Sequence, residues 1–248
     1  MKFFKKLKGK LSINSENHFH EKGKIIITKN GPYKVSGNLP LAKEISLLDK
    51  DGTPCNWKKE EKYPDKENYF LCRCGNSCNK PFCDGTHMKI NFDGTETATK
   101  EKYIEQVEKI VGPEIDLTDV ESFCSNARFC HKAGGAWALT ENSDNPESKK
   151  LAIQEACDCP SGRLVAWDKK SGKQIEPDFQ QSISLIEDPG ADVSGPIWVK
   201  GKIDVESEEK GGYESRNRVT LCRCGKSKNK PFCDGSHIEV GFRADNKK

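Results

Sequence analysis

Apolar and polar residues alternate over two short stretches near opposite ends of the chain. Residues 31–37 read Gly-Pro-Tyr-Lys-Val-Ser-Gly, and residues 195–201 read Gly-Pro-Ile-Trp-Val-Lys-Gly. Alternation of this kind predicts a strand with one buried face, and the Gly-Pro pair predicts a turn that leads into it. Because both stretches begin in the same way, the sequence predicts two similar modules rich in strands.

The stretch between these modules has a different pattern, with apolar residues at helical spacing in several places. Helices are predicted at residues 100–111, 117–132 and 146–157, and short strands at residues 164–167 and 183–186. We therefore expect an α+β protein in which two small β-rich modules flank a middle α+β domain.

A cysteine-rich phrase is repeated in the two modules, at residues 71–87 and 221–237. Both copies read Leu-Cys-Arg-Cys-Gly-x-Ser-x-Asn-Lys-Pro-Phe-Cys-Asp-Gly-(Thr/Ser)-His. Each copy supplies three thiols and one imidazole at the same spacing: Cys72, Cys74, Cys83 and His87 in the first, and Cys222, Cys224, Cys233 and His237 in the second. The repeat predicts a metal site with four ligands that is made twice.

These patterns divide the chain into four parts. They are a basic N-terminal tail (1–23), a first metal module (24–95), a middle domain (96–189) and a second metal module (190–245). In the tail, four apolar residues allow a short helix that touches a membrane surface or a partner, although a frayed terminus is the simpler expectation. These residues are Phe3, Phe4, Leu7 and Leu11.

Composition narrows the classes of function. Of the 248 residues, 34% are apolar and 32% are charged, a balance that suits small polar units held together by metals. The net charge of +3 is too small to predict nucleic acid as a partner. No run of ~18 apolar residues is present, so we expect no transmembrane segment. Twelve cysteines without a secretory signal predict a reducing, cytoplasmic setting.

Three thiols and one imidazole suit two kinds of metal site. Thiolates hold iron-sulfur clusters, and a Cys-x-Cys pair can bind one iron of a two-iron cluster while the following cysteine and histidine bind the other. The alternative is a structural zinc site of the Cys3His type, in an interaction module. Zinc-binding thiol pairs commonly have Cys-x2-Cys spacing, so the tighter Cys-x-Cys spacing favours iron.

Small residues beside the ligands predict the local geometry. If Asp84 caps a short helix that begins with Gly85, then His87 lies on its first turn and can share an iron with Cys83. Four hydroxyls can donate either to sulfur or to the backbone of a local turn, and the sequence leaves both alternatives open. They belong to Ser77, Thr86, Ser227 and Ser236.

Both copies of the phrase resemble the CDGSH iron-sulfur domain, whose pattern is Cys-x-Cys-x2-(Ser/Thr)-x3-Pro-x-Cys-Asp-Gly-(Ser/Ala/Thr)-His. Residues 72–87 and 222–237 match this pattern at every specified position. The resemblance implies a redox-active 2Fe-2S cluster in each module, held by the three cysteines and the histidine, in a small β-rich fold that often works as a dimer. Two copies in one chain suggest an internal pair about a pseudo-twofold axis, either as a monomer or within a homo-oligomer.

The middle segment carries a second resemblance. Cys124-x5-Cys130 and the later Cys159-Pro-Ser-Gly are similar to the divergent 4Fe-4S mono-cluster domain, which is ferredoxin-like. Residues six apart on one helix point about 240° apart, so Cys124 and Cys130 can share a cluster only if the chain uncoils between them. Cys157 or His131 would have to serve as a fourth ligand. Buried free thiols are the alternative to this third cluster, of 4Fe-4S or 3Fe-4S type.

We predict no functional role for the other cysteines, histidines and tryptophans considered, and the sequence contains no enzyme motif. We expect an electron carrier, or a store and donor of clusters, rather than an enzyme. Its partner would be a redox protein or an apo-acceptor, and a further alternative has the middle domain accept electrons for a partner enzyme. We expect the thiols and imidazoles of Cys55, Cys78, His18 and His20 to be bystanders, and the indoles of Trp137, Trp167 and Trp198 to pack in cores.

Overall fold

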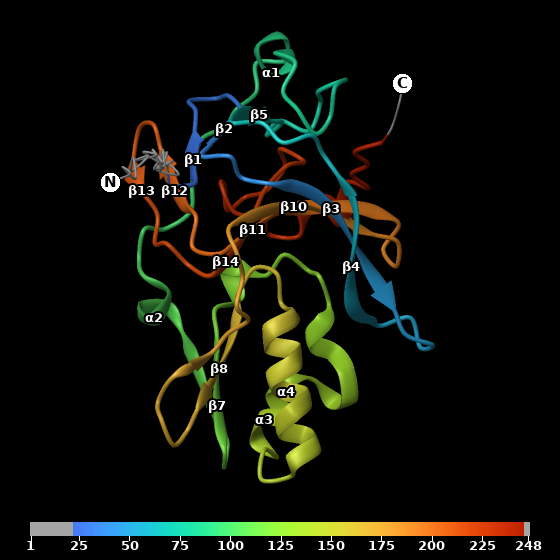
Figure 1. Cartoon of the computed structure of the whole chain (residues 1–248), viewed down its shortest axis with the longest axis vertical. Helices are drawn as coiled ribbons and strands as arrows, with labels where there is room; N and C mark the ends of the chain where they lie inside the picture. Colours follow the sequence, from blue (N-terminus) through green and yellow to red (C-terminus); the bar gives the residue numbers. More distant parts are fainter. Residues whose placement is uncertain (1–21, 246–248) are drawn as a thin grey trace, which may run out of the picture.

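The computed structural model describes residues 22–245 and has three β-sheets with a few short helices (Figure 1). Two five-stranded sheets form the upper half of the view in Figure 1, and a four-stranded sheet with helices α3 (Ala136–Glu141) and α4 (Pro146–Asp158) extends below them. The predicted α+β class is confirmed. The tail positions named above lie outside the described residues: Phe3, Phe4, Leu7, Leu11, His18 and His20.

The first sheet combines strands from both repeats. Its order is β13 (Gly211–Gly212), β12 (Asp204–Ser207), β1 (Lys24–Ile27), β2 (Tyr33–Ser36) and β5 (Asn68–Leu71). Strands β1 and β12 pair in parallel, with Ile25 opposite Val205, whereas β2 is antiparallel to both β1 and β5. At this parallel pair, the first strand of the first repeat meets a strand of the second repeat.

The second sheet is also mixed. Its order is β14 (Arg218–Leu221), β11 (Val193–Lys200), β10 (Ser182–Asp188), β3 (Leu41–Leu48) and β4 (Pro54–Lys62). Strands β10 and β3 pair in parallel, with Leu185 opposite Lys43, and the other neighbours are antiparallel.

The two sheets are related by an internal twofold symmetry of strand order. Replacing β1, β2, β3, β4 and β5 by β10, β11, β12, β13 and β14, and the reverse, converts the order of either sheet into that of the other. Each repeat therefore contributes three strands to one sheet and gives its middle hairpin to the other sheet. This exchange agrees with the predicted pairing of the modules about a pseudo-twofold axis.

One hydrophobic core lies between the exchanged strands. It contains buried residues of both repeats: Ile25, Ile27, Tyr33, Val35, Leu39, Leu41, Tyr69, Leu71, Ile183, Leu185, Ile197, Val199, Ile203, Val205, Val219 and Leu221. Buried and less buried positions alternate along β1 and β2, which is the pattern that the sequence predicted for residues 31–37. Because the core is shared, neither module has a complete core of its own.

The third sheet belongs to the middle region. Its order is β6 (Glu108–Val111), β7 (Ile115–Asp119), β8 (Leu164–Asp168) and β9 (Gln174–Ile175). Leu117, Leu164 and Ala166 of this sheet pack with Ala156 of α4 in a second core. The short elements around it are α2 (Tyr103–Gln106) and the 3₁₀ helices η1 (Glu121–Phe123) and η2 (Phe129–Gly134).

The helix predicted at residues 146–157 is confirmed as α4. The side chain of Asn145 accepts hydrogen bonds from the amides of Glu147 and Ser148, and Pro146 occupies the first turn, where its missing N–H costs nothing. The predicted strands at 164–167 and 183–186 are confirmed as β8 and β10.

The helices predicted at residues 100–111 and 117–132 are wrong. The first range contains the single turn α2 followed by β6, and the second contains the end of β7, then η1 and η2. Ile110 and Leu117 face each other across the β6–β7 ladder, where β-branched and apolar side chains gain cross-strand packing. The positive φ angles of Asn126 and Arg128, 59° and 66°, prevent a continuous helix between the two cysteines.

Arg218 of β14 attaches the middle region to the second sheet. Its guanidinium is 1% exposed and donates to the backbone carbonyls of Cys159, Ala156 and Leu164, while Glu176 forms an ion pair with it. A buried arginine with this many acceptors fixes the relative position of both parts, because any displacement would leave a charge without partners. The end of α4 is therefore held against the strand that leads to the second cysteine-rich loop.

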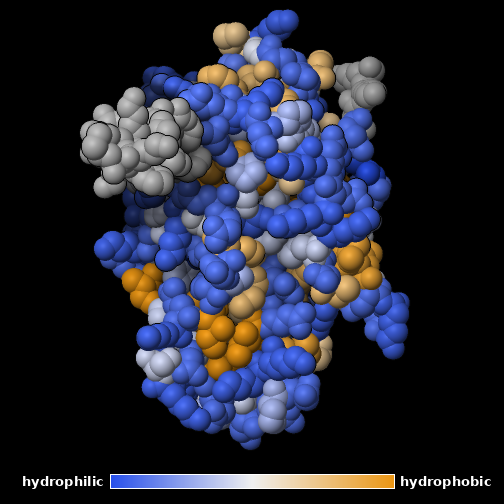
Figure 2. All heavy atoms as spheres, viewed as in Figure 1, coloured by the Kyte–Doolittle hydropathy of each residue, from blue (hydrophilic) through white to orange (hydrophobic). Residues whose placement is uncertain are grey.

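The face shown in Figure 2 is largely hydrophilic, with a compact apolar patch in the lower half, over the middle region. None of the helices within residues 22–245 is long and apolar enough to span a bilayer.

The glycines that follow the Cys-x-Cys pairs mark a close approach of the two repeats. Gly75 and Gly225 both have a φ of 77°, and a Cβ atom on either would collide with the backbone carbonyl of the cysteine in the other repeat, Cys224 or Cys74. Gly52 has a similar φ of 78° but no atom within 4 Å of its ideal Cβ.

We expect Gly75→Ala to destabilise the protein by about 2–5 kcal/mol, the sum of left-handed strain and overpacking at the interface. Gly52→Ala is the matched control and should cost about 1–2 kcal/mol, from strain alone. Thermal unfolding of both variants in the same metal-loaded state measures the difference. Equal losses would contradict the close approach of the repeats.

Candidate metal centres

The first cysteine-rich loop brings its four predicted ligands together as two pairs. Cys72 and Cys74 follow β5, and their Sγ atoms are 3.8 Å apart. Cys83 and His87 flank the start of α1 (Thr86–Lys89), with Sγ 3.3 Å from Nδ1. The loop returns to β5 through an isolated bridge between Leu71 and Phe82, so both pairs are anchored to the same strand.

The second loop repeats this geometry after β14. The Sγ atoms of Cys222 and Cys224 are 3.7 Å apart, and Sγ of Cys233 is 3.4 Å from Nδ1 of His237, at the start of α5 (Ser236–Glu239). The eight candidate ligands thus form two sites with the same arrangement, which we call site 1 (residues 72–87) and site 2 (residues 222–237).

The Asp-Gly pair of each motif shapes the turn that presents the histidine. Asp84 accepts hydrogen bonds from the amides of Thr86 and Cys78, and Asp234 accepts the corresponding bonds in site 2. Gly85 has a φ of 84° and is the N-cap, so α1 begins at Thr86, one residue later than expected. The left-handed φ favours glycine at this position.

The hydroxyl groups of the loops bond locally. Ser77 donates to the carbonyl of Phe82 over 2.6 Å, and Ser227 donates in the same way to Phe232 over 2.7 Å. The hydroxyl of Ser236 donates to the carboxylate of Asp234 over 2.6 Å. Of the two alternatives that the sequence left open, these contacts favour the local turn over the sulfur atoms.

One thiol of each Cys-x-Cys pair ionises more readily than a free cysteine. A hydrogen bond from Cys74, supported by the amides of Ser77 and Gly75, lowers the pKa of Cys72 to about 6. In site 2, Cys224 lowers the pKa of Cys222 to about 6 in the same way. The same hydrogen bonds raise the pKa of Cys74 and of Cys224, so each pair favours a single thiolate, the form that binds metal, near neutral pH.

Arg73 and Arg223, between the cysteines of each pair, have a structural role that the sequence analysis did not assign. Both are buried, and their guanidinium groups donate to backbone carbonyls behind the sites: Arg73 to Gly94 and Thr28, and Arg223 to Gly195 and Ile186. The signal was available, because arginine occupies the same place in both copies of the phrase.

The donor geometry tests which kind of metal group the sites can hold. Within residues 22–245, no three His, Cys, Asp or Glu side chains converge on a position for one metal ion. A tetrahedral zinc ion would require four donors around a single centre. Two donor pairs, each compact and separate from the other, instead fit a group with two metal atoms.

The middle region brings three further thiols together. Cys124 follows η1, Cys130 lies in η2 and Cys159 follows α4. Burial raises the pKa of Cys130 to about 12, with smaller contributions from the neighbouring charges of Cys159 and Cys124, so the three sulfurs lie near one another. The chain uncoils between Cys124 and Cys130, as sharing a metal group requires.

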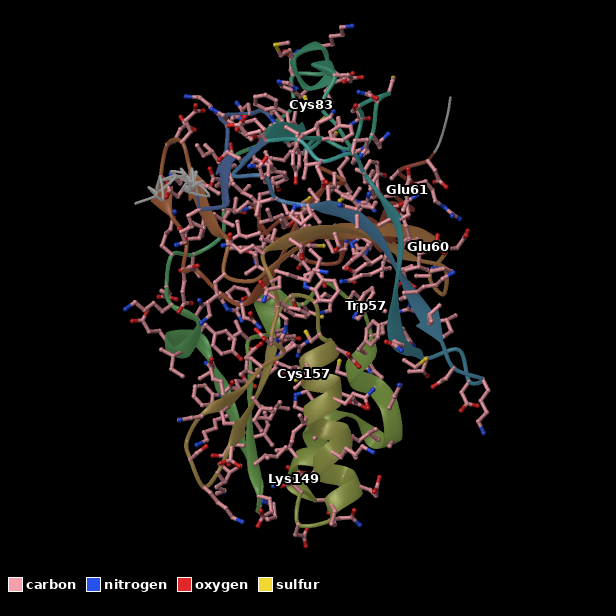
Figure 3. All side chains as sticks on the ribbon, viewed as in Figure 1. Trp57, Glu60, Glu61, Cys83, Lys149 and Cys157 are labelled. Carbon is pink, nitrogen blue, oxygen red and sulfur yellow. The ribbon has the colours of Figure 1, made fainter. Side chains whose placement is uncertain are left out.

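Cys157 points elsewhere. Its Sγ lies 3.7 Å from the carbonyl of Ile175, and Figure 3 shows it at the upper end of α4. His131, the other candidate for a fourth ligand, has its ring 6.4 Å from that of Trp137. Of the predicted set of four cysteines, the structure therefore groups Cys124, Cys130 and Cys159.

Three residues for which the sequence predicts no role in metal binding lie outside the candidate donor sets. Cys78 is exposed and Cys55 is half-buried in β4, while Trp198 is buried against Trp57 and Phe179.

Comparison with protein families agrees with this geometry. The family "Iron-binding zinc finger CDGSH type" matches residues 30–88 and 194–238, and the family "Divergent 4Fe-4S mono-cluster" matches residues 110–169. The chain therefore contains two CDGSH-type domains with a divergent 4Fe-4S domain between them, as both resemblances predicted, and these domains indicate that it binds iron-sulfur clusters. No curated protein and no solved structure gave a significant match.

Proposed function

We propose that sites 1 and 2 each hold a 2Fe-2S cluster and that the protein is an electron carrier or a store and donor of clusters. The observation that carries this proposal is the division of each donor set into two compact pairs. In site 1, Cys72 and Cys74 would bind one iron, and Cys83 and His87 the other. In site 2 the corresponding pairs would be Cys222 with Cys224 and Cys233 with His237.

The chain's own groups fit this role. When bound, such a cluster supplies one-electron chemistry, and an imidazole ligand in place of a thiolate removes negative charge and makes reduction easier. Nδ1 of His87 faces the sulfur of Cys83, which leaves Nε2 to hold a proton. Burial and the nearby Arg223 lower the pKa of His237 to about 4, so its imidazole is neutral, as a metal ligand must be, at neutral pH.

The proposal extends to partners and location. No enzyme activity is proposed for the chain itself. A redox protein or an apo-acceptor would receive electrons or clusters from it, and a reducing compartment such as the cytoplasm suits twelve unpaired thiols.

We expect anaerobically purified protein to be coloured and reducible, with acid-labile sulfide and at least about four irons per chain, the content of two binuclear clusters. Visible absorption and metal analysis measure this. Colourless protein with stoichiometric zinc and no sulfide would refute the cluster proposal and favour the zinc-binding interaction module.

His87→Cys and His237→Cys should each lower the reduction potential of the altered site, because a fourth thiolate charge replaces a neutral ligand. Redox titration followed by visible absorption measures the shift. Cys78→Ser is the control, since this exposed thiol lies in the first loop but in neither donor pair. An unchanged potential in both histidine variants would count against histidine ligation.

We further propose a third cluster in the middle domain, supported by the proximity of three thiols, Cys124, Cys130 and Cys159, of the segment that matches the divergent 4Fe-4S family. Its presence would raise the iron content to about seven or eight per chain. Cys159→Ser should remove the additional iron, whereas Cys157→Ser, two residues away, should leave the iron content unchanged. Equal iron loss in both variants would show that Cys157 is a ligand.

A further inference from the structure

Sites 1 and 2 have the same donors but different access to solvent. In site 2, Cys233 is 2% exposed and His237 is 3% exposed. In site 1, Cys83 and His87 are both partly exposed, and the neighbouring Met88 is 70% exposed. The internal symmetry of the sheets does not predict this difference, so something outside the symmetric scaffold must cover site 2.

The cover is the loop of residues 122–128 in the middle domain, which we call the clasp. At its beginning, the carbonyl of Ser122 accepts a hydrogen bond of 2.9 Å from the side-chain amide of Asn229. The ring of Phe123 lies 5.7 Å from that of Phe232. Both contacts involve residues within the site 2 loop itself.

The rest of the clasp crosses the histidine turn. Asn126 packs so closely on Gly235 that a Cβ added there would be 3.1 Å from the Cβ of Asn126. Arg128 then donates to both carboxylate oxygens of the buried Asp188 in β10, each over 2.6 Å. The clasp is thus fixed at both ends, and its second anchor is the ion pair between Nη2 of Arg128 and the carboxylate of Asp188.

Site 1 has no such cover. Within the part of the chain that the structure describes, the side chain of Asn79, the counterpart of Asn229, makes no hydrogen bond. The ring of Phe82, the counterpart of Phe232, packs edge-on against Tyr63 and Tyr69 of its own repeat. Figure 3 places Cys83 at the top of the molecule, far along its long axis from the middle domain.

We propose that the two sites have different tasks: site 1 is the port where an acceptor protein reaches the metal group, and site 2 exchanges its metal group only when the clasp opens. This inference rests on the proposed function and adds which face the acceptor contacts. An acceptor that takes over a metal group must bring its own donors to the ligands, and only the Cys83–His87 pair offers that approach without a local opening of the chain.

The test compares metal release from each site in the full-length protein. Cys83→Ser and Cys233→Ser each leave one CDGSH-type site intact, and the middle domain is common to both variants. With a chelator in excess, we expect site 2 to release its metal at least about tenfold more slowly than site 1, because opening must precede release. Equal rates, or slower release from site 1, would overturn the proposal.

A matched pair of asparagine variants tests the role of the clasp without replacing any proposed metal ligand. Asn229→Ala deletes the bond to the clasp and should accelerate release from site 2 by about twofold to tenfold, the value of one hydrogen bond. Asn79→Ala is the same change in site 1 and should alter neither rate. Acceleration by both variants, or by neither, would show that the clasp does not control access.

The release experiment can fail the proposed function and this inference separately, because it identifies the metal and also measures the order of release. Release is followed by visible absorption for a cluster and by a zinc-sensitive dye for zinc. If the metal proves to be zinc, the electron-carrier proposal fails, yet the order of release from the two sites still decides whether the clasp controls access.

Discussion

Parallel pairing between strands of different repeats is the constraint on which the rest of the structure depends. The pair β1–β12 joins the strands of the two repeats in the first sheet, and the pair β3–β10 joins them in the second. Without them, the hairpins β3–β4 and β12–β13 would leave open strand edges and exposed core faces, which small domains cannot tolerate. The exchange converts two incomplete modules into one unit with a common core, and the two cysteine-rich loops leave this unit from equivalent strands, β5 and β14.

The same exchange links each metal loop to the other repeat. Gly75 and Gly225 touch the carbonyls of Cys224 and Cys74, so the two donor loops lie back to back at the symmetry axis. Tyr33 of the first repeat also donates its hydroxyl to the carbonyls of Cys222 and Pro231 in site 2. Its counterpart, Ile197, has no hydroxyl to offer to site 1. The scaffold is therefore symmetric in strand order but already unequal in the bonds that hold the loops.

Much of the metal-site geometry could be predicted from the sequence because it is local. The spacing from Cys83 to His87, with a glycine at the turn, leaves the chain few conformations that bring both donors to one side. The exchange of hairpins was predicted only as a pairing of modules, since nothing in residues 41–48 says which sheet they join. The two wrong helices failed for a related reason: residues 108–111 and 115–119 gain their stability from each other across a ladder, which overrides their helical spacing.

The asymmetry of the two sites could not be predicted from the repeats, because it depends on a segment that is not repeated. Arg218 holds the end of α4 against β14, and the bonds of Ser122 with Asn229 and of Arg128 with Asp188 hold the clasp over site 2. The proximity is close enough that the charge of Cys124 helps to raise the pKa of Cys233, after the larger effects of burial and Cys222. The clasp therefore carries one of the three middle thiols, Cys124, and also covers the neighbouring CDGSH-type site. An opening of the clasp would also displace Cys124, so access to site 2 and the proposed middle cluster would depend on the same loop.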